Sequence, residues 1–382
     1  MQTILRKRIL APLMLAFVTA LMFTLSPPRA AATGCHIVID RLVHSARSMP
    51  RADFAGCGLT GAIPTGANRP DGSLPVELGQ LPGGIYSEAL AIAPAGMIVG
   101  DSNTAGGDHA FRYEDGVMID LGTLPGGYTS VALGLNPAGV IVGFSTTASG
   151  NGHAFRYEDG HMTDLGTLPG GNFSEANGIN PAGVIVGEAQ AASGISHAFQ
   201  YQDGHMTDLG TLPGGTAAVA TAINPAGTIV GWSNTASREF HAFRYQDGVM
   251  TDLGTLPGGN VAVATAINPA GAIVGWSTTV SGEFHAFRYE DGHMTDLGTL
   301  PGGNFSVANG INPAGVIVGE AQTASGISRA YRYQDGVMTD LGTLPGGDAA
   351  IATAINPAGV VVGVSSNTVG GDHAYHAVRW QK

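Results

Sequence analysis

The tetrapeptide Leu-Pro-Gly-Gly occurs seven times in this chain of 382 residues, and its spacing constrains the fold more than any other feature. The copies begin at Leu81, Leu124, Leu168, Leu212, Leu256, Leu300 and Leu344, so the spacing is 43 residues once and 44 residues thereafter. A constant period near this length is typical of solenoids, arrays and β-propellers. Each repeat is therefore expected to be one structural unit that packs against its neighbours.

Each repeat contains four runs of strand length separated by turn sequences. In residues 172–215 the turns are Asn180-Pro-Ala-Gly and Asp203-Gly204, and Pro-Gly-Gly ends the unit. Asp-Gly between β-rich runs is a strong hairpin signal, and Asn-Pro-Ala-Gly places proline and glycine where a turn requires them. With 59 glycines and 44% hydrophobic residues, the composition also suits many short strands. The repeat predicts a four-stranded antiparallel meander, which in a propeller blade takes about 40–45 residues.

The two ends of the repeat region are complementary. Asp-Gly occurs in six repeats, whereas the seventh ends near Trp380 without a fourth strand, and residues 74–79 supply a matching run before the first Leu-Pro-Gly-Gly. Pairing of this early strand with the last three would remove an exposed sheet edge. We therefore expect an all-β fold for residues 72–382, a seven-bladed β-propeller closed by the N-terminal strand.

The first strand of each predicted blade carries small residues at alternate positions. In the third repeat these are Ser174, Ala176 and Gly178. Alternation with one face always Ser, Ala or Gly fits a strand crowded between neighbouring blades. We therefore expect the first strand to be innermost, near the axis of the ring.

Residues 1–32 have the features of a secretory signal peptide. Arg6, Lys7 and Arg8 precede an apolar run of 17 residues from Ile9 to Leu25, and small residues follow up to Ala32. This pattern predicts export and cleavage near Ala32. Because the run is slightly shorter than a membrane span of about 20 residues, an uncleaved anchor is the alternative. After cleavage we expect no stable membrane insertion, and a location in the periplasm, at the cell surface or outside the cell.

Residues 33–71 form a lead-in that holds both cysteines of the chain, Cys35 and Cys57. An even pair in an exported protein most simply forms one disulfide. The alternative is a lipobox-like sequence at residues 32–35, in which lipidation of Cys35 would leave Cys57 unpaired. Two prolines and Arg29 between the apolar run and Cys35 argue against lipidation.

The charge of the chain excludes some partners. The net charge is −12, and removal of residues 1–32 would bring it to −16, because four basic residues and no acid lie there. This charge repels phosphate backbones, so we expect no nucleic-acid binding. No Gly-x-Ser-x-Gly, His-Glu-x-x-His or P-loop sequence is present, so neither an enzyme activity nor a cofactor is predicted.

The third run of most repeats has the sequence His-Ala-Phe-Arg-Tyr or a near copy of it, followed further on by Asp-Leu-Gly-Thr-Leu-Pro-Gly-Gly. The histidines are His109, His153, His197, His241, His285 and His373. Over residues 74–382 these motifs resemble the HAF family of extracellular bacterial repeats. The resemblance implies an exported bacterial protein and no particular reaction. Two repeats depart from the motif: the sixth has Arg329-Ala330-Tyr331, and the seventh offers both His373 and His376.

The repeated histidines are expected to be structural. Positions repeated in third strands lie about one blade apart on a wide circle, so seven side chains there cannot converge on one metal ion. Each His is expected to bind an Asp such as Asp164 or Asp208 and so connect neighbouring blades. Asp-Gly lacks the further oxygen ligands of a calcium loop, so we expect no metal site.

Positions that vary between repeats indicate where a ligand could bind. The residue predicted to follow the second strand is Asp101, Phe144, Glu188, Trp232, Trp276, Glu320 or Val364. In the next loop the fourth and fifth repeats add Phe240 and Phe284 beside Glu239 and Glu283. These loops should share one face with the turns between blades, where Tyr86, Tyr128, Phe173 and Phe305 begin their strands.

Aromatic and carboxylate side chains on one face suit a sugar or a peptide. The predicted ligand-binding residues are Trp232, Trp276, Phe240, Phe284, Glu188, Glu320, Tyr86 and Tyr128. The alternative for both tryptophans is that they fill space between blades.

Three function hypotheses follow from these patterns. The first is an exported, monomeric, non-catalytic scaffold that binds an extracellular glycan or protein. The second is a structural or adhesive surface protein without a small ligand. The third is a propeller hydrolase or lyase acting on extracellular polysaccharide, which requires a carboxylate cluster near the axis, with Glu88 and Glu175 as the candidates in first strands.

Overall fold

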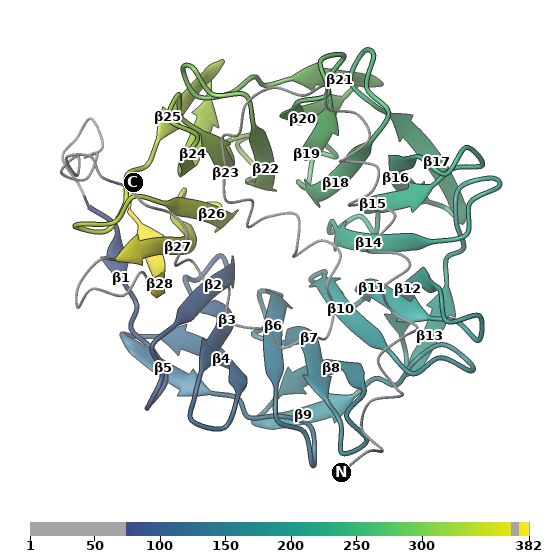
Figure 1. The fold of residues 1–382 in the computed structure, drawn as a ribbon. Coiled ribbons are helices and arrows are strands. Elements are labelled where there is room, and N and C mark those ends of the chain that lie inside the picture. Colours follow the sequence, from purple (N-terminus) through teal and green to yellow (C-terminus); the bar gives the residue numbers. More distant parts are fainter. Residues whose placement is uncertain (1–73, 368–373, 382) are drawn as a thin grey trace, which may run out of the picture. The chain divides into compact units, whose positions relative to one another are not determined.

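The computed structural model describes residues 74–367 and 374–381, which form seven four-stranded antiparallel sheets arranged around one axis (Figure 1). Every regular element in these ranges is a strand, so the predicted all-β, seven-bladed propeller is confirmed. The predicted signal peptide, the Cys35–Cys57 pairing and His373 lie outside the described residues.

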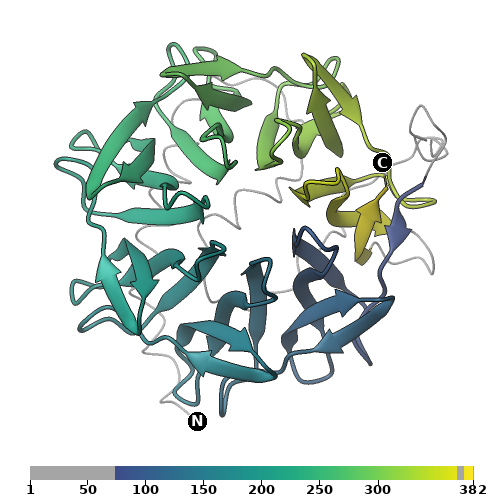
Figure 2. The same cartoon turned by 180° about the vertical axis from the view of Figure 1, so that it is seen from behind.

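Successive strands of a blade run from the axis outward, as Figures 1 and 2 show. Blade 1 is β2 (Ser87–Ile92), β3 (Ile98–Asn103), β4 (Asp108–Glu114) and β5 (Val117–Asp120). Blade 2 is β6 (Ser130–Leu135), β7 (Ile141–Thr146), β8 (Gly152–Glu158) and β9 (His161–Asp164). Blade 3 is β10 (Ser174–Ile179), β11 (Ile185–Gln190), β12 (Ser196–Gln202) and β13 (His205–Asp208). Blade 4 is β14 (Ala218–Ile223), β15 (Ile229–Asn234), β16 (Phe240–Gln246) and β17 (Val249–Gly254).

The remaining blades follow the same order. Blade 5 is β18 (Ala262–Ile267), β19 (Ile273–Thr278), β20 (Phe284–Glu290) and β21 (His293–Asp296). Blade 6 is β22 (Ser306–Ile311), β23 (Ile317–Gln322), β24 (Ser328–Gln334) and β25 (Val337–Asp340). Blade 7 is β26 (Ala350–Ile355), β27 (Val361–Asn367), β28 (Ala374–Trp380) and β1 (Val76–Glu77).

The seventh blade combines both ends of the described chain. Its strand order is β1-β28-β27-β26, and both views show β1 beside β28. Val76 pairs with Arg379 and Glu77 pairs with Val378. Just beyond this short ladder, the backbone N–H of Leu78 donates to the carbonyl of Ala377 at 2.9 Å. The predicted closure by the N-terminal strand is therefore confirmed.

The turn sequences adopt the backbone conformations that their residues favour. In the hairpins at Asp-Gly both residues have positive φ, as at Asp203 (52°) and Gly204 (82°), which matches the twist of the strands. In Leu168-Pro-Gly-Gly, Gly170 has a φ of 80° and the N–H of Gly171 donates to the carbonyl of Leu168. A Cβ on Gly171 would lie 1.9 Å from the carbonyl oxygen of Gln190, so the second glycine permits a close approach of two backbones.

The hydrophobic core is divided among the junctions between blades. One cluster joins Val142 and Ala154 of blade 2 to Ala176, Ile185 and Phe199 of blade 3, and each other junction has an equivalent cluster. The cluster at the closing junction contains Leu78 and Leu81. Each blade is therefore stabilised mainly by contact with its two neighbours.

The first strands are innermost and crowded, as predicted. Their side chains were also expected to alternate strictly between the two faces of the sheet, but they do not. The register of each first strand shifts once, in β10 between Ala176 and Gly178. Ala176 packs toward blade 2, whereas a Cβ on Gly178 would lie 3.4 Å from the Cα of Ala222 in blade 4. The expectation of one uniform face was wrong because the bulge turns the strand over.

Serine hydroxyls connect neighbouring blades. Ser174 accepts a hydrogen bond from the backbone N–H of Ala154 in blade 2 (2.8 Å) and donates to the carbonyl of Gly166 in the connecting segment. Ser87 makes the same two contacts, with Ala377 and Gly79, across the closing junction. The small residues predicted from crowding thus have a second role that the alternation alone did not indicate.

Candidate functional site

Histidine–aspartate pairs recur on one end of the ring, at the start of the third strands. The Nδ1 atom of His153 lies 2.8 Å from Asp164 Oδ2, and that of His285 lies 2.8 Å from Asp296 Oδ2. Blades 1, 3 and 4 have the same pair, formed by His109–Asp120, His197–Asp208 and His241–Asp252. The other carboxylate oxygen accepts the backbone N–H two residues further on, as Asp296 Oδ1 does from Gly298 at 2.7 Å.

These pairs were expected to connect neighbouring blades, and that expectation was wrong. Each pair joins the third and fourth strands of one blade, because the hairpin places His153 and Asp164 diagonally on the same face of the sheet. The Asp also holds the glycine that begins the connection to the next blade. The link between blades is made by the following serine instead.

Blades 6 and 7 complete the series with different residues. Arg329 Nε lies 3.9 Å from Asp340 in blade 6, and His376 Nδ1 lies 2.7 Å from Glu77 in blade 7. His376 pairs with Ser365 as His285 pairs with Ser277. The sequence left His373 and His376 as alternatives for the repeated histidine of the seventh repeat, and His376 occupies that position.

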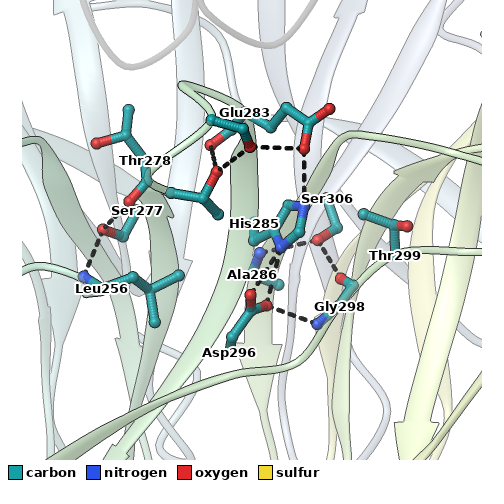
Figure 3. A network of polar contacts seen from close by, with 12 residues as sticks. Leu256, Ser277, Thr278, Glu283, His285, Ala286, Asp296, Gly298, Thr299 and Ser306 are labelled. Carbon is teal, nitrogen blue, oxygen red and sulfur yellow. Dashed lines mark hydrogen bonds and ion pairs between the residues drawn. The ribbon is translucent and has the colours of Figure 1, made fainter. Parts of the chain in front are cut away.

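Blades 4 and 5 extend the pair by a carboxylate and a hydroxyl. In blade 5, Glu283 Oε2 lies 4.0 Å from His285 Nε2 (Figure 3). The same oxygen accepts a hydrogen bond from Ser281 Oγ at 2.9 Å. In blade 4 the corresponding distances are 3.9 Å for Glu239 to His241 and 3.1 Å for Ser237 to Glu239. Both glutamate side chains are 41% exposed, so this network is open to solvent. Both glutamates stand out in the sequence as loop residues beside Phe240 and Phe284, but their contact with the repeated histidines was not predicted.

Aromatic pairs lie in the same two blades. The ring centroids of Trp232 and Phe240 are 5.1 Å apart with an interplanar angle of 79°, and those of Trp276 and Phe284 are 5.2 Å apart at 71°. Phe284 also contacts Phe305 of blade 6, with centroids 6.4 Å apart. All four paired rings are half-buried. Edge-to-face contact of this kind fixes ring orientation.

The variable position was expected to follow the second strand, but it lies inside that strand. Trp232 is the fourth residue of β15 and pairs with Val219 on one side and Ala242 on the other. Ala242 belongs to the cluster between blades 4 and 5, so Trp232 shares the face of blade 4 that is directed at blade 5. The strand extends further than expected because Ser233 and Asn234 continue the ladder.

At the same position blades 1 and 3 carry acids that pair with acids in the first strand. Glu88 pairs with Asp101 and Glu175 with Glu188, and Glu88 accepts a hydrogen bond of 2.5 Å from the hydroxyl of Tyr86. Burial, and next the carboxylate of Glu188, raise the pKa of Glu175 to about 8. The carboxylates required by the hydrolase hypothesis thus lie in two separate blades.

The remaining predicted residues differ in accessibility. Tyr128 is 55% exposed, whereas Glu320 is 1% exposed. Glu320 lies in the same blade as Tyr331, and burial together with this acid raises the pKa of the Tyr331 hydroxyl. Glu188 and Tyr86 are half-buried. The structure therefore brings together Trp232 with Phe240 and Trp276 with Phe284, and distributes the other four over blades 1, 2, 3 and 6.

The described part of the chain offers neither a metal centre nor a membrane-spanning helix. Residues 74–367 and 374–381 contain no group of three or more His, Cys, Asp or Glu side chains arranged to hold a metal ion. The same residues include no helix with the length and apolar character needed to cross a membrane.

Comparisons with known proteins identify the fold. No protein-family model and no curated protein sequence matches the chain. Among solved structures it is similar to the β-propeller domain of the Trilobed protease from Pyrococcus furiosus, with 8% identity, a TM-score of 0.51, and coverage of 78% of this chain and 95% of that one. It is also similar to a puromycin-hydrolyzing peptidase of Mycobacterium tuberculosis (12% identity, TM-score 0.49), with coverage of 84% of this chain.

The chain spans 55% of that peptidase, about half of its length. A lectin of Aleuria aurantia matches with 13% identity and a TM-score of 0.37, over 68% of this chain and 97% of the lectin. At 8% identity, the similarity to the protease domain shows the propeller fold alone.

Proposed function

We propose that this protein is an exported, non-catalytic binding scaffold of the HAF type. Its proposed ligand is a glycan or a peptide held on the end of the propeller where the loops between second and third strands meet the connections between blades. The observation that carries this proposal is made at the junction of blades 4 and 5. There the aromatic pair Trp232–Phe240 lies on the face of blade 4 directed at blade 5, and the solvent-exposed Glu283 with His285 lies on the face of blade 5 directed at blade 4. An aromatic surface beside a few polar groups is the usual composition of a ligand site.

The local arrangement supports a role beyond packing. Glu239 and Glu283 are not needed to fill the junctions, because their side chains are 41% exposed. Each is nevertheless held by a serine and lies beside a histidine whose other nitrogen contacts an aspartate. Orientation of a carboxylate by fixed neighbours lowers the entropic cost of ligand binding.

Binding to glycan and peptide arrays tests this proposal. The exported protein is compared with the double variant Trp232→Ala/Trp276→Ala, and the melting temperature of each is measured. A signal on the array that the double variant loses is the expected result. A double variant with a lower melting temperature and an unchanged array signal would show that the tryptophans only pack, and an intact protein without any array signal would overturn the proposal. Val249→Ala/Val337→Ala is the control, since both valines are 61% exposed beside Asp-Gly turns at the opposite end.

A polysaccharide hydrolase or lyase is the second candidate, and the Glu175–Glu188 pair favours it. A carboxyl group with its pKa raised to about 8 is protonated at neutral pH, as a general acid must be. Release of reducing ends or unsaturated products from polysaccharides, abolished by Glu175→Gln, would establish this function in place of simple binding.

A further inference from the structure

Blade 6 departs from blades 1 to 5 at the junction that it forms with blade 5. Arg329 stands where those blades have the repeated histidine, and Ile327 stands where blade 5 has Glu283. Arg329 lies on the face of β24 directed at blade 5, because its partner in the sheet, Ala321, belongs to the apolar cluster at that junction. The junction of blades 5 and 6 therefore has a basic side chain where the junction of blades 4 and 5 has an acid and a histidine.

The guanidinium of Arg329 is nearly buried and lacks the partners that such a charge requires. Its side chain is 12% exposed, and neither Nε nor Nη1 donates a hydrogen bond to any described residue. Asp340 Oδ2 approaches Nε only to 3.9 Å, and Oδ1 accepts the backbone N–H of Gly342. Glu320 lies on the opposite face of the sheet, because its partner Ala330 packs toward blade 7. An unpaired buried guanidinium is costly, so Arg329 is suited to an acceptor that a ligand brings.

The facing side of blade 5 provides an aromatic surface and a further donor. Trp276 is directed at blade 6, because it pairs with Ala286 of the same apolar cluster, and its ring contacts that of Phe284. Phe284 continues the surface to Phe305 at the start of blade 6. The indole Nε1 of Trp276 is buried and has no hydrogen-bond partner among the described residues. Two groups that can only donate, a guanidinium and an indole N–H, therefore project into one junction.

From these donors we infer that the junction of blades 5 and 6 binds a sugar residue that carries a carboxylate. The acid group lies on Arg329 and the pyranose ring lies on the aromatic surface of Trp276 and Phe284. The planar guanidinium fork matches the two oxygens of a carboxylate. In a uronic acid the carboxylate is attached directly to a ring with apolar faces, so one residue contacts both parts of the site. This site is separate from the junction of blades 4 and 5, on which the proposed function rests.

The strand pairing and the charge of the protein argue against other acidic ligands. The third strands β20 and β24 are paired on both sides, so an acidic peptide cannot add to either as a further strand. The net charge of −12 repels a densely charged polyanion far more than a sugar with one carboxylate. A glycan with isolated acidic residues is therefore the ligand that this junction suits.

Calorimetry of the whole exported protein tests this assignment. The ligands are the methyl glycosides of glucuronic and galacturonic acid and, for comparison, those of glucose and galactose. At least one acid should bind about tenfold more tightly than its neutral parent, because hydrogen bonds between charged groups are the strong ones. Arg329→His restores the pattern of blades 1 to 5, so it should keep or raise the melting temperature and yet reduce the affinity for the acid to that of the neutral sugar.

Arg332→Gln is the matched control, because Arg332 lies on the opposite face of β24 and donates to Gln334. It should leave the affinity for the acid within about twofold. Absence of acid binding, equal affinity for acidic and neutral sugars, or acid binding that survives Arg329→His would overturn the inference. Tighter binding of acetate or of a short aspartate peptide would also overturn it, since the ring would then contribute nothing. The array experiment above decides separately on the junction of blades 4 and 5.

Discussion

The Nδ1 atom of His376 in β28 lies 2.7 Å from Oε1 of Glu77 in β1. In blades 1 to 5 the corresponding pair joins two strands of one hairpin, whereas here it joins the two ends of the described chain. The pair is partly exposed and by itself contributes only about 0.2–1 kcal/mol. The closing junction therefore depends more on the apolar residue that follows, Leu78, which is 6% exposed.

Substitution of Leu78 should open the ring. Leu78→Ala removes a buried side chain from the closing cluster and should lower the free energy of unfolding by about 2–4 kcal/mol. Urea denaturation followed by tryptophan fluorescence measures this change. Leu74→Ala, at a leucine that is 44% exposed, is the control and should cost less than about 0.5 kcal/mol. Equal effects of the two variants would argue against closure through β1.

Glycine at the third position of each second strand should be irreplaceable. A Cβ on Gly187 would lie 1.9 Å from the carbonyl oxygen of Glu175 in the first strand, and both backbones are fixed by the sheet. Gly187→Ala should therefore destabilise the protein by at least about 2 kcal/mol, measured as a shift in melting temperature. Gly106→Ala, where the nearest atom is 3.8 Å away, should leave the melting temperature unchanged.

The junction between blades 1 and 2 should respond to a stabilising substitution. Near the axis, Thr353 and Asn356 of blade 7 donate to Ala89 and Ala93 of blade 1, and blades 3 to 6 make similar contacts with the next blade. Blade 1 has Leu90 and Ala93 at these two positions. Ala93→Asn should add the turn contacts that Asn136 makes and raise the free energy of unfolding by about 0.5–1.5 kcal/mol.

Asn356→Ala is the converse change, and it should lower the stability by a similar amount. Hydrogen exchange provides an independent measurement, since β2 and β6 should exchange more slowly in Ala93→Asn than in the unaltered protein. Unchanged exchange there would indicate that this junction is already as tight as the others.

Stability should fall as the pH rises from about 4.5 to about 8. The pKa of Glu175 is raised from 4.5 to about 8 in the folded state, by burial first and by Glu188 second. Over this range Glu175 binds more protons in the folded protein than in the unfolded chain, so its contribution to the free energy of unfolding decreases as the pH rises. Thermal unfolding at a series of pH values measures the slope. In Glu175→Gln the decrease should be smaller, and a slope identical to that of the unaltered protein would contradict the assignment.

Arg238 should be replaceable by glycine with a gain in stability. It has a φ of 67° in the loop of blade 4, where the corresponding residue is Gly150, Gly194, Gly282 or Gly326 in four other blades. A side chain in this conformation costs about 1 kcal/mol relative to glycine. Arg238→Gly should therefore raise the free energy of unfolding by about 0.5–1 kcal/mol in chemical denaturation, and a loss of stability would show that the guanidinium makes a contact of greater value.

The sequence periodicity predicted the blades and their number, because turn residues and strand lengths are local properties of the sequence. It also predicted the closure, because the last repeat lacks a fourth strand and an additional strand precedes the first repeat. The partners of side chains across a sheet were harder to predict. The His153–Asp164 contact depends on which residues become diagonal neighbours in a hairpin, and the bulge at Ala176 reverses a face that strict alternation would have kept. Trp232 was placed one element too late for a similar reason, since the end of a strand is set by the ladder and not by its own residues.

The pairing of β1 with β28 also has a consequence for the order of assembly. Almost the whole repeat region lies between these two strands in the sequence. Contacts of such large sequence separation form slowly. During synthesis the partner strand of β1 is made last, so the sheet of blade 7 cannot be completed before the other six blades have been synthesised. A β1 strand from a second molecule fits the same place, so concentrated refolding should yield exchanged dimers that dilute refolding does not.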